Sequence, residues 1–97
     1  MHKLALLAIL EAKPGKEGEV SAFLQSALPL AAQENQTVSW FAFRIGNSRF
    51  GIFDTFSDEA GRNAHLNGEI AKALFAKAED LLAATPQIEQ LEILVAK

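Results

Sequence analysis

The stretch TVSWFAFRIGNSRFGIFDTF, residues 37–56, decides the fold of this chain. Residues 37–45 and 49–56 are rich in β-branched and aromatic side chains, which pack well on a pleated sheet. The Gly46-Asn47 pair between them suits the tight turns that join antiparallel strands. The stretch therefore predicts a β-hairpin with a two-residue loop.

That loop length predicts which hairpin side chains share a face, because side chains alternate along a strand. Phe43 would lie opposite Phe50, and Trp40 opposite Phe53. One face would hold Phe41, Phe43, Ile45, Phe50 and Ile52, and the other would hold Val38, Trp40, Ala42, Arg44 and Phe53. Neither face is polar, so we expect both to be covered.

Upstream of the hairpin, the sequence predicts one strand and one helix. Residues 4–10, LALLAIL, form an apolar run that ends at Lys13-Pro14-Gly15, which is typical of a buried strand followed by a turn. Residues 15–35 carry apolar side chains at helical spacing, which predicts an amphipathic helix. Pro29 should kink this helix or end its regular part.

Downstream of the hairpin, the sequence predicts two helical stretches and a last strand. Ser57-Asp58 offers a helix cap, and the helix that follows meets a break at Asn67-Gly68. A second helical stretch ends before Thr85-Pro86. Residues 88–96 then predict a strand that closes the chain.

The order strand, helix, strand, strand, helix, strand predicts an α+β fold of the ferredoxin-like βαββαβ type in one domain, residues 1–97. Its helices would cover one face of a four-stranded antiparallel sheet. The other face would still carry apolar side chains, each costly to leave in water. We therefore expect a homodimer in which two such sheets pack together.

The composition excludes several classes of function. The 97 residues carry a net charge of −3 with no basic run, which argues against nucleic acid as a partner. The absence of cysteine excludes disulfides and thiolate metal sites. No apolar run approaches the length of a membrane span, and the run at residues 4–10 lacks the cleavage site of a signal peptide. We expect a cytoplasmic protein without membrane contact.

Histidine offers the clearest candidate for proton chemistry. His65 lies at the edge of the apolar helix stripe, just before the predicted break, where it could exchange a proton near neutral pH. From its position alone, a hydrogen-bonded boundary residue that ties helix to sheet is the more common role for such a histidine. His2, at the terminus, is expected to be solvated and without a role.

Three residues of the hairpin are candidates for ligand contacts. Trp40 and Arg44 project to the same side of their strand, where an indole and a guanidinium could hold a planar, electron-rich ligand. They could instead be packing and ion-pairing residues. Asp54 interrupts an apolar strand, and if buried it needs a partner such as Arg44 or a main-chain donor. A base with a raised pKa is the other reading of Asp54.

Motifs that would name a reaction are missing. The chain has no glycine-rich nucleotide loop, no HExxH zinc motif and no GxSxG nucleophile elbow. Its two histidines, His2 and His65, have no nearby acid cluster in the sequence, so no metal site is predicted. The residues alone therefore give a fold and candidate side chains, but no reaction.

Three stretches resemble the antibiotic biosynthesis monooxygenase superfamily of dimeric α+β barrels. They are residues 12–17 (AKPGKE) with the helix start behind them, residues 53–60 (FDTFSDEA) and residues 64–68 (AHLNG). The resemblance implies a homodimer with a pocket between sheet and helices in each subunit. It also implies a cofactor-independent monooxygenase that oxidises a quinol-like or polyketide-like aromatic with O₂, needing neither metal nor flavin.

Under that resemblance, candidate roles can be assigned residue by residue. His65 would transfer a proton or stabilise an anion, Arg44 would pair with an anion, and Trp40, Phe53 and Phe75 would be pocket walls. Haem-degrading members place an Asn, a Trp and a His where this chain has Ala8, His65 and Phe75. The haem-binding histidine is missing, so we do not expect haem degradation.

Two other functions stay open at this point. The chain could be a non-catalytic dimeric module that binds a small hydrophobic ligand or supports a stress response. It could also be an isomerase or lyase on the same scaffold. Oxygen uptake with hydroquinones and anthrones would separate the oxygenase from both.

Overall fold

A computed structural model describes residues 3–97, so the expectation for His2 lies outside the described part of the chain. The elements follow the predicted order, with each helical region divided in two. They are β1 (Leu4–Glu11), α1 (Glu17–Ser26), α2 (Leu28–Ala32), β2 (Thr37–Ile45), β3 (Arg49–Phe56), α3 (Glu59–Leu66), α4 (Glu69–Leu81) and β4 (Gln87–Glu92). The strands form one antiparallel sheet in the order β2-β3-β1-β4. This is the predicted ferredoxin-like α+β fold.

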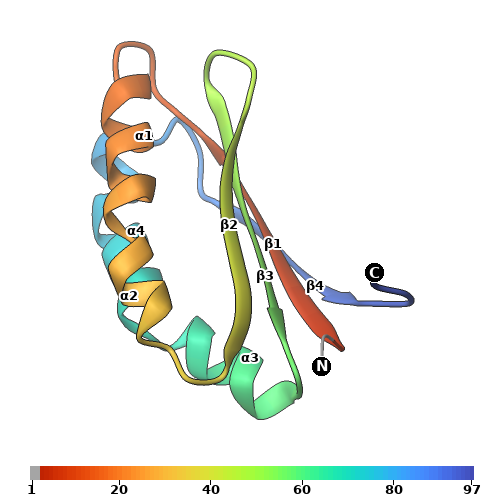
Figure 1. The fold of residues 1–97 in the computed structure, drawn as a ribbon. Coiled ribbons are helices and arrows are strands. Elements are labelled where there is room, and N and C mark those ends of the chain that lie inside the picture. The colour runs from red at the N-terminus through yellow and green to blue at the C-terminus, as the bar shows by residue number, and fades with distance from the viewer. Residues whose placement is uncertain (1–2) are drawn as a thin grey trace.

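The helices α1, α2 and α4 lie on one face of the sheet and leave the other face bare, as Figure 1 shows. The main core lies between the helices and the sheet. Its buried members come from β1 and β3 and from the apolar stripes of the helices, and they are Ala8, Leu10, Ala12, Val20, Leu24, Phe50, Ile52, Leu74, Leu81 and Leu82. The apolar run of β1 is therefore the central support for the helical layer.

The first predicted helix is broken where Pro29 requires it. Proline at position i cannot donate to the carbonyl four residues earlier and crowds it. The structure ends α1 at Ser26 and begins α2 at Leu28, with Pro29 in the first turn of α2. That position tolerates proline, because its N–H would have no partner within the helix.

The predicted hairpin register is wrong, because the loop has three residues rather than two. Ile45 pairs with Arg49, and Gly46, with a φ of 77°, begins the loop. Ser48 is held outside the ladder by β1: its carbonyl accepts from Ala12 N at 2.8 Å and its hydroxyl donates to Glu11 at 3.1 Å.

The shift of one residue exchanges the faces of β3. Phe50 pairs with Arg44 and Ile52 with Ala42, so these side chains face the helices together with Trp40 and Asp54. Phe53 pairs with Phe41 on the bare face. We call this bare side the open face. Its apolar side chains come from all four strands, and they are Leu7, Ile9, Phe41, Phe43, Ile45, Phe53 and Leu91.

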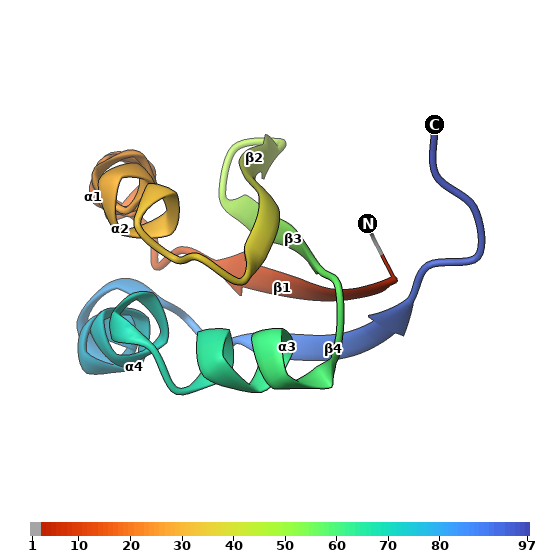
Figure 2. The same cartoon turned by 60° about the horizontal axis from the view of Figure 1, so that its bottom comes forward.

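The last strand is shorter than predicted. It ends at Glu92, which pairs with Leu4, the first residue of β1. One further bond joins Ile93 N to Lys3 O, and beyond it Leu94 and Val95 are 86% and 89% exposed. The chain leaves the sheet edge at this end, as Figure 2 shows. Among residues 3–97, no helix is both long and apolar enough to cross a membrane.

Candidate functional site

His65 is held in place by the short helix α3, which begins at a well-formed cap. The Asp58 side chain accepts from Gly61 N at 2.9 Å, so it satisfies a backbone donor that the first helical turn leaves free. One helical face then turns inward and carries His65, which is 8% exposed. Its ring lies 5.5 Å from that of Phe56, at a tilt of 44°. The helix ends at the Asn67-Gly68 break, as the sequence predicts.

Asp54 reaches His65 from the sheet beneath it. It lies on the helix-facing side of β3, between Leu6 of β1 and Trp40 of β2, and is 1% exposed. Its Oδ2 lies 2.8 Å from His65 Nε2, close enough for an ion pair, although the N–H is not aligned as in a regular hydrogen bond. Its Oδ1 has no hydrogen-bond partner among the described residues. The partner of this buried carboxylate is therefore His65, not Arg44.

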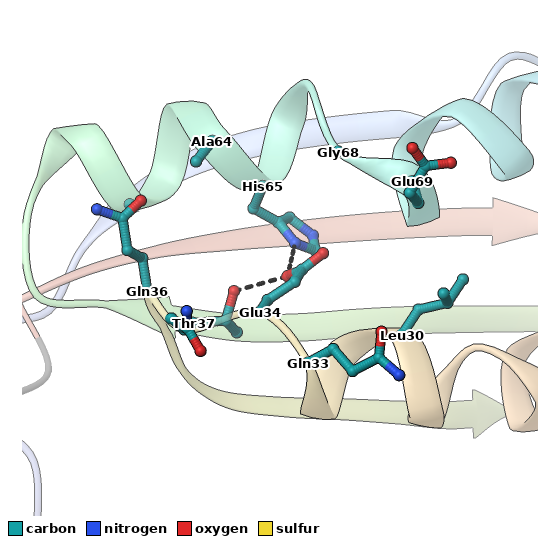
Figure 3. A pocket seen from close by; sticks show the side chains of 11 residues that line it. Leu30, Gln33, Glu34, Gln36, Thr37, Ala64, His65, Gly68 and Glu69 are labelled. Carbon is teal, nitrogen blue, oxygen red and sulfur yellow. Dashed lines mark hydrogen bonds and ion pairs between the residues drawn. The ribbon is translucent and has the colours of Figure 1, made fainter.

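Glu34 contacts the other side of the same imidazole. It follows α2 in the turn before β2, and its Oε1 lies 2.7 Å from His65 Nδ1. The hydroxyl of Thr37 donates to the same oxygen at 2.7 Å, as Figure 3 shows. The Glu34 side chain is 21% exposed, so it is the outer of the two carboxylates. The row Asp54–His65–Glu34, which we call the carboxylate–imidazole relay, joins three elements far apart in sequence.

The relay controls the charge of its imidazole. Burial disfavours the charged ring and lowers the pKa of His65, but the contacts to Asp54 and Glu34 and their negative charges outweigh that effect. The pKa of His65 is therefore raised above its ordinary value of 6.5. A carboxylate lies against each ring nitrogen, and both carboxylates favour the charged form of the imidazole.

A cavity of about 580 Å³ opens beside the outer end of the relay. Its walls come from the α2–β2 connection on one side and from α3 and the start of α4 on the other (Figure 3). The lining residues are Leu30, Gln33, Glu34, Asn35, Gln36, Thr37, Gly61, Ala64, His65, Gly68 and Glu69. A ligand bound there would contact Glu34 and the edge of the His65 ring, while Asp54 would contact the same ring from its buried side.

Trp40 and Arg44 lie on the same side of β2, as predicted, but at separate places. Trp40 packs against the main core and against a second buried cluster, which consists of Ala27, Ala31 and Ile70. Its buried Nε1 has no partner among the described residues. Arg44 lies near the hairpin end with its guanidinium 4.9 Å from the centre of the Phe50 ring. The structure brings Trp40 next to Asp54 in register, and it leaves Arg44 away from the relay.

The two predicted phenylalanine walls lie outside the cavity. Phe53 is on the open face of the sheet, because of the register described above. Phe75 lies on α4, is 50% exposed, and borders a different depression near Pro86. The cavity beside the relay is thus lined mainly by amides, carboxylates and small residues, and neither phenylalanine nor tryptophan is among its lining residues.

Sequence reasoning missed Glu34. One signal was present: an acid directly follows the C-terminal end of a helix, where the helix dipole disfavours negative charge. Such a placement indicates a partner elsewhere in the fold. That partner lies 31 residues away in the chain, so local patterns could not identify it. Among residues 3–97, no group of three or more His, Asp or Glu side chains could hold a metal ion.

Comparison with known proteins gives structural relatives. No protein-family model matches the chain, and no curated protein gives a significant match. A protein of unknown function from Nitrosomonas europaea, NE2512, is 59% identical, with a TM-score of 0.98 over 100% of this chain and 94% of that one.

Two more distant structures share the fold. One from Nitrosomonas europaea, described as a "putative antibiotic biosynthesis monooxygenase", is 12% identical, with a TM-score of 0.84 over 96% of this chain and 91% of that one. Another with the same description, from Caulobacter crescentus, is 18% identical, with a TM-score of 0.82 over 97% and 92%. At these identities the likeness concerns the fold alone.

Proposed function

We propose that this chain, which belongs to the same family as the Nitrosomonas europaea protein NE2512 and has the fold of the antibiotic biosynthesis monooxygenases, is a cofactor-independent monooxygenase. Its substrate would be a quinol-like or polyketide-like aromatic, oxidised with O₂. The observation that carries this proposal is the relay, whose outer carboxylate borders the cavity.

The relay suits the first step, which is removal of a phenolic proton. A phenol bound in the cavity would donate to the Glu34 carboxylate, whose charge is balanced by the adjacent His65 ring. Asp54 would keep that ring oriented and charged from its buried side. We assign His65 and Glu34 as the catalytic residues and Asp54 as the positioning residue. Trp40, the register neighbour of Asp54, stays our proposed aromatic support.

The rest of the reaction balances with substrate and O₂ alone. The phenolate transfers one electron to O₂, the two radicals combine at a ring carbon, and the O–O bond then breaks with loss of water. A hydroquinone C₆H₆O₂ and O₂ give a hydroxyquinone C₆H₄O₃ and H₂O. One oxygen atom enters the product and the other leaves as water. The substrate supplies all four electrons.

We also propose that the protein acts as a homodimer formed through its open faces. Phe41 and Ile45 are 58% and 41% exposed there, beside partly buried apolar side chains of β1 and β3. Leaving such a surface in water costs about 25 cal/mol per Å². A second copy of the chain is the simplest partner for this surface, because a two-fold dimer packs the same surface patch of each subunit against the other.

Oxygen uptake tests the proposed reaction. The metal-free protein is incubated with hydroquinones and anthrones, and O₂ consumption is followed with an electrode. We expect turnover that falls by about 10²-fold or more in Glu34→Gln and in His65→Gln. Glu59→Gln, which removes an exposed carboxylate of α3 outside the cavity, is the matched control and should keep its rate. No uptake by the wild-type protein with any of these compounds contradicts the proposal.

One observation favours a second function, a non-catalytic module that binds a small ligand. Both nitrogens of His65 already contact carboxylates, which is what a purely structural tie between helix and sheet requires. In that case a ligand would raise the melting temperature without O₂ uptake. A thermal shift with the same compounds under nitrogen separates the two functions.

A further inference from the structure

The cavity beside the relay has an unusual balance of charge. Two of its lining residues, Glu34 and Glu69, are carboxylates, and none is a lysine or an arginine. In Figure 3, Glu34 lies under the His65 ring, and Glu69 lies toward the opposite end of the cavity from Gln36. Any ligand that fills the space therefore meets a carboxylate near its middle and another near one end.

The positive charge among the lining groups does not cancel these carboxylates. Even when it is protonated, the His65 ring offsets only one of the two carboxylates that it contacts, Asp54 and Glu34, so the relay as a whole keeps at least one negative charge. Glu69 adds a second. The N-terminus of α4 opposes them with about half a positive charge, and Glu69 stands in its first turn. The cavity is thus negative overall.

The remaining lining groups are neutral. The amides of Gln33, Asn35 and Gln36 and the hydroxyl of Thr37 can donate and accept hydrogen bonds. Leu30, Ala64 and two glycines supply flat apolar wall. These groups suit a planar aromatic ligand that carries hydroxyl groups, and none of them provides a positive charge to pair with the carboxylate of an acidic ligand.

We propose that the cavity is selective for charge: it takes uncharged or ammonium-bearing hydroxylated aromatics and rejects those that carry a carboxylate. The inference rests on the proposed function, because it assigns the substrate class of the same site. Like charges at close range disfavour binding strongly where water is partly excluded. An ammonium group would instead pair with Glu69, and phenolic hydroxyls would reach Glu34.

Three quinols of the same frame and size test the proposal. They are ethylhydroquinone, 2-(2,5-dihydroxyphenyl)ethylamine and 2,5-dihydroxyphenylacetate, which are neutral, cationic and anionic at pH 7. Their dissociation constants are measured by calorimetry under nitrogen, so that neither turnover nor autoxidation interferes. We expect the carboxylate to bind at least tenfold more weakly than the neutral compound, and the amine to bind at least as tightly as the neutral one.

Charge variants identify the residue responsible. Glu69→Gln should reduce the ratio between the dissociation constants of the carboxylate and the amine several-fold. Glu69→Lys should reverse the order of affinity, so that the carboxylate binds more tightly than the amine. Glu59→Gln and Glu59→Lys are matched controls, because Glu59 is the first residue of α3 as Glu69 is of α4, yet lies outside the cavity lining. The controls should leave the order of the three compounds unchanged.

Each outcome separates this inference from the oxygenase proposal. Binding in the expected order without O₂ uptake in air supports charge selection and contradicts the oxygenase. Equal or tighter binding of the carboxylate overturns charge selection, whether or not the quinols are oxidised. Failure of all three compounds to bind at millimolar concentration also overturns it.

Discussion

At the scale of single residues, the molecule depends on one imidazole that separates two carboxylates. His65 contacts Asp54 at 2.8 Å and Glu34 at 2.7 Å, and Asp54 is 1% exposed. Removing the ring would leave a buried carboxylate without a counter-charge, which is among the costliest defects in a small protein. Of the two roles that the sequence leaves open for His65, the structure contains the contacts of a structural tie, and proton transfer is the role that we propose.

Replacing His65 should cost far more stability than a surface substitution does. We expect His65→Ala to lower the free energy of unfolding by about 3–5 kcal/mol, since Asp54 is left unpaired. The double variant Asp54→Leu/His65→Leu, which replaces the pair with apolar groups, should be more stable than either single variant. Urea denaturation measures His65→Ala, the double variant and its two single variants. A loss below about 1 kcal/mol in His65→Ala would show that the pair contributes little.

The raised pKa of His65 predicts how stability changes with pH. A group with a folded pKa above its unfolded value of 6.5 binds its proton more tightly in the native state. Its contribution is complete below pH 6.5 and is lost as the pH rises through the folded pKa. We expect the free energy of unfolding to fall over that interval by at most about 1.4 kcal/mol per pH unit.

Urea denaturation at a series of pH values above 6 checks this prediction, and His65→Gln serves as the control without the titrating group. NMR titration of the His65 ring gives the folded pKa independently. Stability that rises with pH over this interval would mean that burial, not the two carboxylates, determines the direction in which the pKa of His65 is shifted.

At the scale of elements, local sequence patterns determine which helices and strands form, and long-range contacts determine the register and the ends of the paired strands. The strand content, the break at Pro29 and the Asp58 cap can all be predicted, because each follows from a few adjacent residues. The hairpin register cannot, since the loop length depends on Ser48 bonding to the end of β1. The end of β4 likewise depends on where β1 begins to pair, at Leu4.

The same dependence on long-range contacts determines which residues of the candidate site can be predicted from the sequence. The residues His65 and Asp54 stand out in the sequence as a lone histidine and an acid within an apolar strand. Glu34 lies in a polar run after a helix end, a position that indicates a partner without identifying it. Only the fold, which places α3 opposite the α2–β2 connection, brings Glu34 to the ring. The sequence also predicts the wrong face for Phe53, because the hairpin loop is one residue longer than the predicted one.

The cap of α3 should be worth about 1 kcal/mol, because Asp58 accepts from Gly61 N, one of the backbone donors that the first turn of a helix leaves without an intrahelical partner. We expect Asp58→Ala to lose about that amount and Asp58→Asn to retain most of it. Thermal unfolding measures both, with Glu59→Ala, an exposed neighbour, as the control. Equal melting temperatures for Asp58→Ala and the wild type would mean that the cap is dispensable.

At the scale of the whole molecule, the bare face of the sheet predicts self-association. Phe41→Asp places a charge at the most exposed aromatic position of the open face, so it should shift a dimer toward monomer by at least tenfold in dissociation constant. Phe75→Asp, on α4 and 50% exposed, is the control because it lies outside that face. Sedimentation at micromolar concentration measures both. A monomeric, well-folded wild-type protein would contradict the proposed pairing.

The location of the cavity has a consequence for such a pair. It opens between α2, α3 and α4, on the helical side of the sheet, whereas the open face looks the other way. Two copies joined back to back would therefore present their entrances outward, with two sheets between them. Occupancy of one should leave the other unaffected, so saturation curves should be hyperbolic, with a Hill coefficient close to one.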